Sequence, residues 1–281
     1  MKELKGGTYT GERALFSSQG LGIINAVFED GESPLKESSN IELDGCTFRW
    51  KYPLWYCRGV VARNCTLDAT ARSGIWYTDN IEMTDCTIDA PKTFRRSSDI
   101  RLRDVEFSLA LESLWNCSRV DMRRVGVKGD YFGMGSSDVY AEQLEVLGNY
   151  IFDGGKNIEV RNSRLISKDA FWNCENVTVR DSYIEGEYLG WNSKNVTFIN
   201  CTIESNQGLC YMDGVTLVNC QLVHTDLAFE YSRVDADIRS SVDSVKNPIS
   251  GRIIADSIGE IIMQPECVDV SATDIVERSK E

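Results

Sequence analysis

The chain has 281 residues, 26% of them charged, and carries a formal net charge of −13. This acidity opposes binding to nucleic acid or to an anionic membrane surface, because both are negatively charged. The N-terminus has no apolar signal-like segment, and no run of about 18 apolar residues occurs anywhere. We therefore expect a soluble, cytoplasmic protein with no membrane partner and no nucleic-acid partner.

Ten cysteines and a single histidine, His224, limit the metal chemistry that the chain can support. No two cysteines have the Cys-x-x-Cys spacing that zinc and iron–sulfur sites commonly use. We therefore predict no metal site and no cofactor, and we expect most of the cysteines to be structural.

Residues 1–22 are rich in glycine and are followed by a repeat that runs almost to the end of the chain. The first apolar residue of each copy, here called the anchor, recurs every 19 to 21 residues, most often every 19. A period near 20 residues with β-branched anchors is typical of a stacked solenoid. The anchors are Ile41, Val60, Ile81, Ile100, Val120, Val139, Ile158, Val177, Val196, Val215, Val234 and Ile253.

Residues at the same offset from successive anchors form columns. Apolar residues stand at the anchor and at +2, +5 and +7, while Asn or Asp is common at +4. This pattern predicts a half-buried strand, a bend and a second strand. A third apolar element at −6 predicts a third short strand. The fold class is therefore all-β: a right-handed parallel β-helix of about 12–13 coils with a 19-residue period.

We expect a single β-helix domain over residues 1–270. Residues 1–22 would form the first coil and N-terminal cap, and residues 254–270 the C-terminal cap. Caps are needed because an open edge strand would pair with other chains. Residues 271–281 would be a C-terminal tail.

Eight of the ten cysteines fall in the +5 and −3 columns, where other copies carry Val, Leu, Ser or Thr. Such exchanges indicate small buried packing residues rather than redox chemistry. These cysteines are Cys46, Cys57, Cys65, Cys86, Cys117, Cys174, Cys201 and Cys220.

Five of the six tryptophans stand at −5, and Tyr, Asn and Arg are common at −4. Arg95 and Asp153 share the −5 column and would be costly in a core, so we expect this column to face outward. It would form a ribbon of rings and amides on which a sugar could stack or a protein could dock. Packing of the rings as a ladder is the structural alternative. The candidate ligand-binding residues are Trp55, Tyr56, Trp76, Tyr77, Arg95, Arg96, Trp115, Asn116, Asp153, Trp172, Asn173, Trp191, Asn192, Tyr211 and Glu230.

Paired carboxylates are required for glycoside hydrolysis, and the acids considered for this role are Asp79, Asp153, Asp169 and Glu230. None forms a compact motif, so the catalytic residues stay unassigned. Coil length barely varies, which leaves no long loops to wall a cleft. His224 is expected to be a turn residue rather than a base.

Arginine is frequent at +3, as in Arg103, Arg123 and Arg161. Acids at +1 and +4 balance these charges, so we expect a solvated face rather than a polyanion site.

The opening Gly-Gly-Thr-Tyr-Thr-Gly-Glu-Arg-Ala-Leu-Phe at residues 6–16, the Asn-Cys-Thr and Asp-Cys-Thr turns, and the Trp-Asn-Cys stretches resemble a bacterial family known as domain of unknown function 3737. The resemblance places the chain in the pectin-lyase-like right-handed β-helix superfamily and implies that fold over almost its whole length. It implies no activity. Pectin-cleaving members use calcium-binding aspartates with an arginine base, or an aspartate cluster, and neither set maps onto this sequence. The missing Cys-x-x-Cys pairs oppose a hydrogenase.

Three functions therefore stay open. The first is a non-catalytic protein whose ribbon binds a glycan or another protein, with a homodimer as one version. The second is a carbohydrate-active enzyme, either a polysaccharide lyase or a glycoside hydrolase. The third is a structural, self-associating scaffold.

Overall fold

The computed structural model describes residues 2–278, in which strands β1 to β24 are joined by turns and no α-helix occurs. Within this range, no helix has the length and apolarity needed to cross a membrane. Contacts divide the chain into two compact units, Met1–Glu145 (unit 1) and Val146–Glu281 (unit 2). We describe each unit by itself, and the single domain expected from the sequence stays a prediction.

The predicted all-β parallel β-helix is confirmed. The strands build a solenoid of about 15 turns with a period of about 19 residues, more turns than the 12–13 expected. The additional turns come from the ends of the chain. At the N-terminus, Lys2 pairs with Leu21 in the same parallel register as the regular coils.

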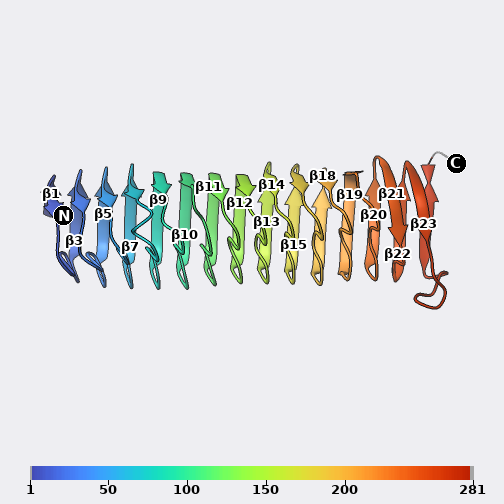
Figure 1. Cartoon of the computed structure of the whole chain (residues 1–281), viewed down its shortest axis with the longest axis horizontal. Coiled ribbons are helices and arrows are strands. Elements are labelled where there is room, and N and C mark those ends of the chain that lie inside the picture. The colour runs from blue at the N-terminus through green and yellow to red at the C-terminus, as the bar shows by residue number, and fades with distance from the viewer. Residues whose placement is uncertain (1, 279–281) are drawn as a thin grey trace. The chain divides into compact units, whose positions relative to one another are not determined.

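Unit 1 places long strands of successive coils side by side, as Figure 1 shows for β3, β5 and β7. The anchors pair as predicted, Ile41 with Val60 and Val60 with Ile81. The strands are β1 (Lys2–Lys5), β2 (Thr8–Tyr9), β3 (Gln19–Ile24), β4 (Val27–Phe28), β5 (Ser39–Asp44), β6 (Thr47–Phe48), β7 (Arg58–Arg63), β8 (Thr66–Leu67), β9 (Asp79–Ile88), β10 (Ser98–Phe107), β11 (Ser118–Lys128) and β12 (Ser137–Leu147), whose last residues belong to unit 2.

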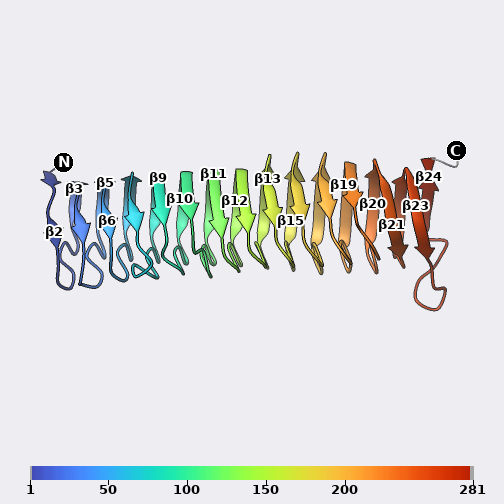
Figure 2. The same ribbon diagram turned by 45° about the horizontal axis from the view of Figure 1, so that its top comes forward.

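Unit 2 repeats this parallel pairing, with Val177 opposite Val196 and Val196 opposite Val215 (Figure 2). Its strands are β13 (Lys156–Arg161), β14 (Arg164–Ile166), β15 (Glu175–Arg180), β16 (Tyr183–Glu185), β17 (Lys194–Ile199), β18 (Thr202–Glu204), β19 (Asp213–Val223), β20 (Arg233–Ile238), β21 (Ser241–Lys246), β22 (Ser250–Ala255), β23 (Ser257–Ile262) and β24 (Thr273–Glu277).

The core follows the predicted columns. The eight cysteines of the +5 and −3 columns are all buried, and among residues 2–278 no cysteine is in a disulfide. Two thiols in the −3 column donate to carbonyls of the preceding coil, Cys57 Sγ to Leu35 O at 3.1 Å and Cys174 Sγ to Phe152 O at 3.0 Å. Serines in that column make the same bond, as Ser136 Oγ does to Leu114 O at 2.6 Å. The structural role predicted for these cysteines is therefore confirmed.

The third predicted strand is wrong. The segment around −6 forms turns. Main-chain hydrogen bonds and isolated bridges such as Trp76–Arg95 and Arg95–Trp115 join successive coils there, but no continuous strand forms. The reason is backbone conformation. Leu114 at −6 has φ of 58° and Asn116 at −4 has φ of 51°, both left-handed. Two left-handed residues within three cannot continue an extended strand.

Two predictions at the C-terminal end are also wrong. Val234 pairs with Gly251 rather than with the predicted anchor Ile253, which pairs with Ala236. Residues 273–277 lie in the segment expected to be a tail, yet they form β24, which pairs with β22. Residues 279–281 of that segment lie outside the described residues. The β-branched residues Thr273, Ile275 and Val276 explain why the strand forms despite its polar flanks.

Candidate binding surface

The tryptophans of the −5 column are half-buried and fixed by the main chain of the following coil. Each indole nitrogen donates to a turn carbonyl 16 to 18 residues further along the chain. The donor–acceptor distances are 2.6 Å for Trp55 to Ser73, 2.8 Å for Trp76 to Lys92, 2.6 Å for Trp115 to Tyr131, 2.7 Å for Trp172 to Tyr188 and 2.7 Å for Trp191 to Gln207.

In unit 1 these side chains form a continuous stack. The rings of Trp55 and Trp76 lie 5.0 Å apart and 7° from parallel. The Arg95 guanidinium continues the stack, 4.7 Å from the ring centre of Trp76 and 4.6 Å from that of Trp115. Arg95 also lies 3.3 Å from Glu112 Oε2. The Arg95 charge, which led us to expect that the −5 column faces outward, is thus stabilised by two indole rings and a carboxylate.

A second rank of rings lies beside the first in unit 1. Tyr56 and Tyr77 stack at 4.8 Å and 7°, and the Lys36 ammonium lies 5.6 Å from the centre of the Tyr56 ring. Tyr56 is 48% exposed, the highest value among the aromatic residues of the ribbon. Because the ring faces cover one another, the ring edges and the two hydroxyl groups form the outer surface.

Unit 2 carries a shorter stack. Trp172 and Trp191 lie 5.8 Å apart at 9°, and Trp191 contacts Tyr211 at 4.9 Å in a tilted geometry. Tyr211, 40% exposed, in turn contacts Tyr231. Asp153 occupies the −5 position of the coil before Trp172 and accepts a hydrogen bond of 2.9 Å from Asn173.

The polar candidates at −4 have a backbone explanation. Asn116, Asn173, Asn192 and Arg96 all have φ between 49° and 58°. Asparagine tolerates this left-handed conformation better than other non-glycine residues. Their presence in the column therefore requires no ligand.

Glu230 lies one column away from its predicted place. Tyr211 N donates to Glu230 O. In regular coils this bond runs from a −4 residue to the −5 residue of the next coil, as from Asn173 N to Trp191 O. Glu230 therefore takes the −5 place. A bulge in the pairing of β19 with β20 causes this shift. The Glu230 carboxylate lies 2.9 Å from Lys246 Nζ and raises the pKa of that ammonium.

Among the four candidate catalytic acids, Asp153 and Asp169 interact only through charge, since the Asp153 carboxylate contributes to the raised pKa of Asp169. Asp169 is 1% exposed, and its Oδ1 has no hydrogen-bond partner within residues 2–278. Burial raises the pKa of Asp169, the Tyr150 hydroxyl opposes that rise, and the charge of Asp153 contributes to it. Asp79 instead accepts a hydrogen bond from the Ser98 hydroxyl group, and Glu230 forms an ion pair with Lys246. Since Asp169 is sealed from solvent, the pair lacks the access that a catalytic acid needs.

Sequence reasoning missed one polar cluster in unit 2. The Tyr183 hydroxyl lies 2.9 Å from Glu185 Oε2 and 3.2 Å from Glu204 Oε2. Burial and both carboxylates raise the pKa of Tyr183 to about 12. His224, a bend residue as predicted, lies 2.9 Å from Glu204 and has a raised pKa because of that carboxylate. Nothing in the sequence linked these residues except their places on adjacent coils.

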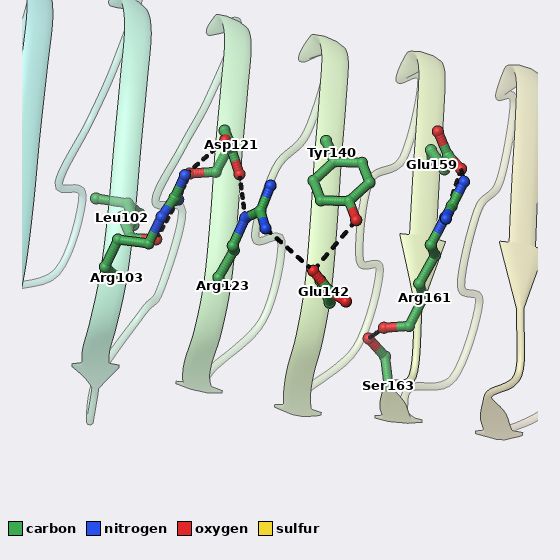
Figure 3. Close-up of polar contacts among 9 residues, drawn as sticks. All are labelled: Leu102, Arg103, Asp121, Arg123, Tyr140, Glu142, Glu159, Arg161 and Ser163. Atoms are coloured by element: carbon green, nitrogen blue, oxygen red, sulfur yellow. Dashed lines mark hydrogen bonds and ion pairs between the residues drawn. The ribbon is translucent and has the colours of Figure 1, made fainter.

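Three of the arginines at +3, Arg103, Arg123 and Arg161, pair with acids as predicted, whereas Arg63 and Arg180 form no ion pair within residues 2–278. Figure 3 shows Arg103 and Arg123 on either side of Asp121, at 2.6 Å and 3.5 Å, with Arg123 also 3.4 Å from Glu142. The Tyr140 hydroxyl donates to Glu142 at 3.2 Å. Within residues 2–278, no group of three or more His, Cys, Asp or Glu residues is arranged to hold a metal ion.

These observations define a parallel β-helix protein with stacked aromatic side chains on its turns. The model of a family described as a protein of unknown function (DUF3737) matches residues 2–276, and the chain belongs to this family. The family prediction is thus confirmed. No curated protein matches the sequence.

Three solved structures are similar to this chain. The surface adhesin PfbA of Streptococcus pneumoniae has 9% identity and a TM-score of 0.40, covering 76% of this chain and 71% of its own. The A-module of a mannuronan C-5 epimerase of Azotobacter vinelandii has 11% identity and a TM-score of 0.32, covering 98% and 86%. A plasmid-mediated fluoroquinolone resistance protein has 16% identity and a TM-score of 0.29, covering 76% and 92%.

Proposed function

We propose that this protein is a non-catalytic binding protein, and that the aromatic ribbon of unit 1 docks a protein partner. The observation that carries the proposal is the stacking of Tyr56 on Tyr77 beside Trp55 and Trp76. A sugar binds an aromatic side chain through the open face of the ring, and here the rings within each stacked pair cover one face of each other. Ring edges, hydroxyl groups and flanking cations are the groups from which protein interfaces are built.

The rigidity of the ribbon supports the same proposal. Trp55 and Trp76 are held by indole-to-carbonyl hydrogen bonds, so the rings lose little conformational entropy when a partner binds. The −13 net charge favours a partner with a basic surface.

Tyr77 replaced by the photo-crosslinking residue p-benzoylphenylalanine tests the proposal in cells of the source organism. We expect discrete protein adducts after illumination, which disappear when Tyr56→Ala is added. The same replacement at Thr87, an exposed residue on the outer face of β9, is the matched control and should give none. Equal labelling from both positions would contradict the proposal. An adduct with a second copy of this chain would support it and identify the partner.

A glycan panel distinguishes protein binding from sugar binding by the ribbon. If immobilised glycans bind the protein and Trp76→Ala abolishes that binding, the ribbon is a sugar site and our proposal is wrong. Tyr56→Ala is the better variant for protein binding. Its side chain is 48% exposed but stacks on Tyr77, so we expect a loss of stability of about 0.5–1.5 kcal/mol with the fold retained.

A further inference from the structure

A ladder of asparagine amides lies directly before the anchors of unit 2. Asn176 Nδ2 donates to Asn157 Oδ1 at 3.1 Å, and Asn195 Nδ2 donates to Asn176 Oδ1 at 2.8 Å. Each amide thus accepts from the following coil and donates to the preceding one. Such a ladder satisfies the hydrogen-bonding groups of amides that would otherwise bond to water.

In unit 1 the same column reads Asn40, Gly59 and Asn80, and the ladder is interrupted. The backbone does not require the glycine, because all three residues are left-handed, with φ of 53°, 70° and 55°. An asparagine would fit there, as it does on either side. The missing amide leaves Asn40 Oδ1 without a donor and Asn80 Nδ2 without an acceptor. Neither side chain has another hydrogen bond within the described part of the chain.

The side chain at +1, in the neighbouring outward-facing column, is also small in this coil. Val61 pairs in register with Glu42 on β5 and with Glu82 on β9, so a short apolar side chain lies between two carboxylates. The result is a depression of about 310 Å³ over β7, which lies between β5 and β9 in Figure 1. We call it the Gly59 notch.

The notch is built from two similar walls and an apolar floor. Asn40 and Glu42 line one side, Asn80 and Glu82 the other, and Val61 lies between them. The two walls are two strand spacings apart, roughly 9.5 Å. Arg101 lies 3.6 Å from Glu82 and balances its charge, whereas Glu42 has no ion-pair partner within residues 2–278.

We propose that the Gly59 notch binds one sugar residue that carries no acidic group. One hydroxyl group of the ring can donate to Asn40 Oδ1 while a neighbouring hydroxyl group accepts from Asn80 Nδ2, so the two together replace the missing amide. The two carboxylates accept hydrogen bonds from further hydroxyl groups, and Val61 packs against the C–H face of the ring. The volume is at the small end of ligand sites, which suits a single ring.

The charges set the specificity. Glu42 and Glu82 outweigh Arg101, so the site repels uronates and sugar phosphates and accepts neutral sugars or amino sugars. This site is separate from the aromatic ribbon, and the proposal holds whether or not the ribbon binds a protein.

The variant Gly59→Asn tests the proposal because it restores the ladder and fills the notch. The added Cβ would lie 3.1 Å from Asn40 Oδ1, which the amide can accommodate by a small movement. The matched control is Gly214→Asn, in the same column of unit 2, where a Cβ meets nothing closer than 3.8 Å. We expect both variants to fold.

The probes are glucose, N-acetylglucosamine, glucosamine and glucuronate, measured by saturation-transfer difference NMR and calorimetry on the full chain. We expect at least one of the first three to bind, glucuronate to bind at least about tenfold more weakly, and Gly59→Asn to weaken binding at least about tenfold. Gly214→Asn should bind as the unaltered protein does.

Three results would overturn the proposal: no binding of any of the three sugars, equal binding by Gly59→Asn, or preferential binding of glucuronate. Tighter binding of glucosamine that is lost in Glu42→Gln would support it and would assign the amino group to Glu42.

Discussion

Single left-handed residues shape the candidate surface. Phe171 and Asn173 have φ of 56° and 53°, and Trp172 stands between them. This sequence of conformations turns the main chain sharply, so the phenylalanine enters the core while the tryptophan lies along the turn. A β-branched residue at either flanking position would be strained by its φ. The positions on either side of Trp172 therefore disfavour valine, isoleucine and threonine.

Asp169 is the residue for which pH should matter. Its pKa is raised mainly by burial, so the folded state holds the proton more tightly than the unfolded chain does. The stability contributed by the protonated acid is complete below the ordinary aspartate pKa, roughly 4, and is lost as pH rises to the folded pKa. Asp169→Asn cannot ionise and keeps an oxygen that accepts from Tyr150.

We therefore expect the stability of Asp169→Asn relative to the unaltered protein to increase with pH from about 4 and then to level off. Urea unfolding at a series of pH values measures this difference. Asp235→Asn, an exposed residue of β20, removes the same charge and should show no such trend. A flat difference for Asp169→Asn would contradict the assignment of a raised pKa.

Between coils, the Arg95 side chain acts as a rung that links the stacked Trp55 and Trp76 to Trp115. The Arg95 side chain contacts Trp76 and Trp115, and bridges in the main chain follow the same order. We expect Arg95→Ala to cost about 1–3 kcal/mol, because two cation–π contacts and their packing are lost. Arg95→Trp should recover part of that loss, since the column accepts tryptophan on both sides.

Equilibrium unfolding and hydrogen exchange of the Tyr77 amide, which bonds to Arg95 O, measure this effect. The control is Arg58→Ala, an exposed residue of β7 with no ion pair within residues 2–278, for which we expect a change within about 0.5 kcal/mol. Equal costs for the two alanine variants would show that Arg95 does not act as a rung.

Across the whole molecule, thiol accessibility separates core from surface. Nine cysteines are buried and Cys267 is exposed. Burial also raises the pKa of Cys57 to about 11 and that of Cys174 to about 12, which disfavours the reactive thiolate. We expect one thiol of the native protein to react rapidly with a disulfide reagent near pH 8, and ten after denaturation.

Cys267→Ser should abolish the rapid phase, while Cys57→Ser should leave it unchanged and fold normally, because serine already occupies that column in other coils. More than one rapidly reacting thiol would contradict the packing described for the cysteine columns.

The periodic columns predicted most of the fold, because inward residues of a solenoid repeat their chemistry in every coil. Ile41, Val60 and Ile81 were enough to predict a register that the structure confirms. The turns around −6 were predicted wrongly, since an apolar residue such as Leu114 looks the same in sequence whether its φ is negative or left-handed. Glu230 was misplaced because a one-residue bulge leaves no mark on a period that is read from anchors alone.

The candidate site was less predictable than the fold. The tryptophan column was visible, but whether rings present faces or edges depends on contacts between coils. Trp76 could be found in the sequence; its hydrogen bond to Lys92 O and its stacking on Trp55 could not. The Gly59 notch could have been found as a coil with small residues at −1 and +1 between two coils that carry asparagine and glutamate there.

The direction of the indole hydrogen bonds bears on how the chain folds during synthesis. Trp76 bonds to a carbonyl 16 residues later, and Trp55 to one 18 residues later. When a ribosome delivers the chain from its N-terminus, each indole must wait for the next turn before its bond can form. We therefore expect the stacks to close one coil at a time behind the ribosome, with each tryptophan unbonded until the turn of the next coil has been synthesised.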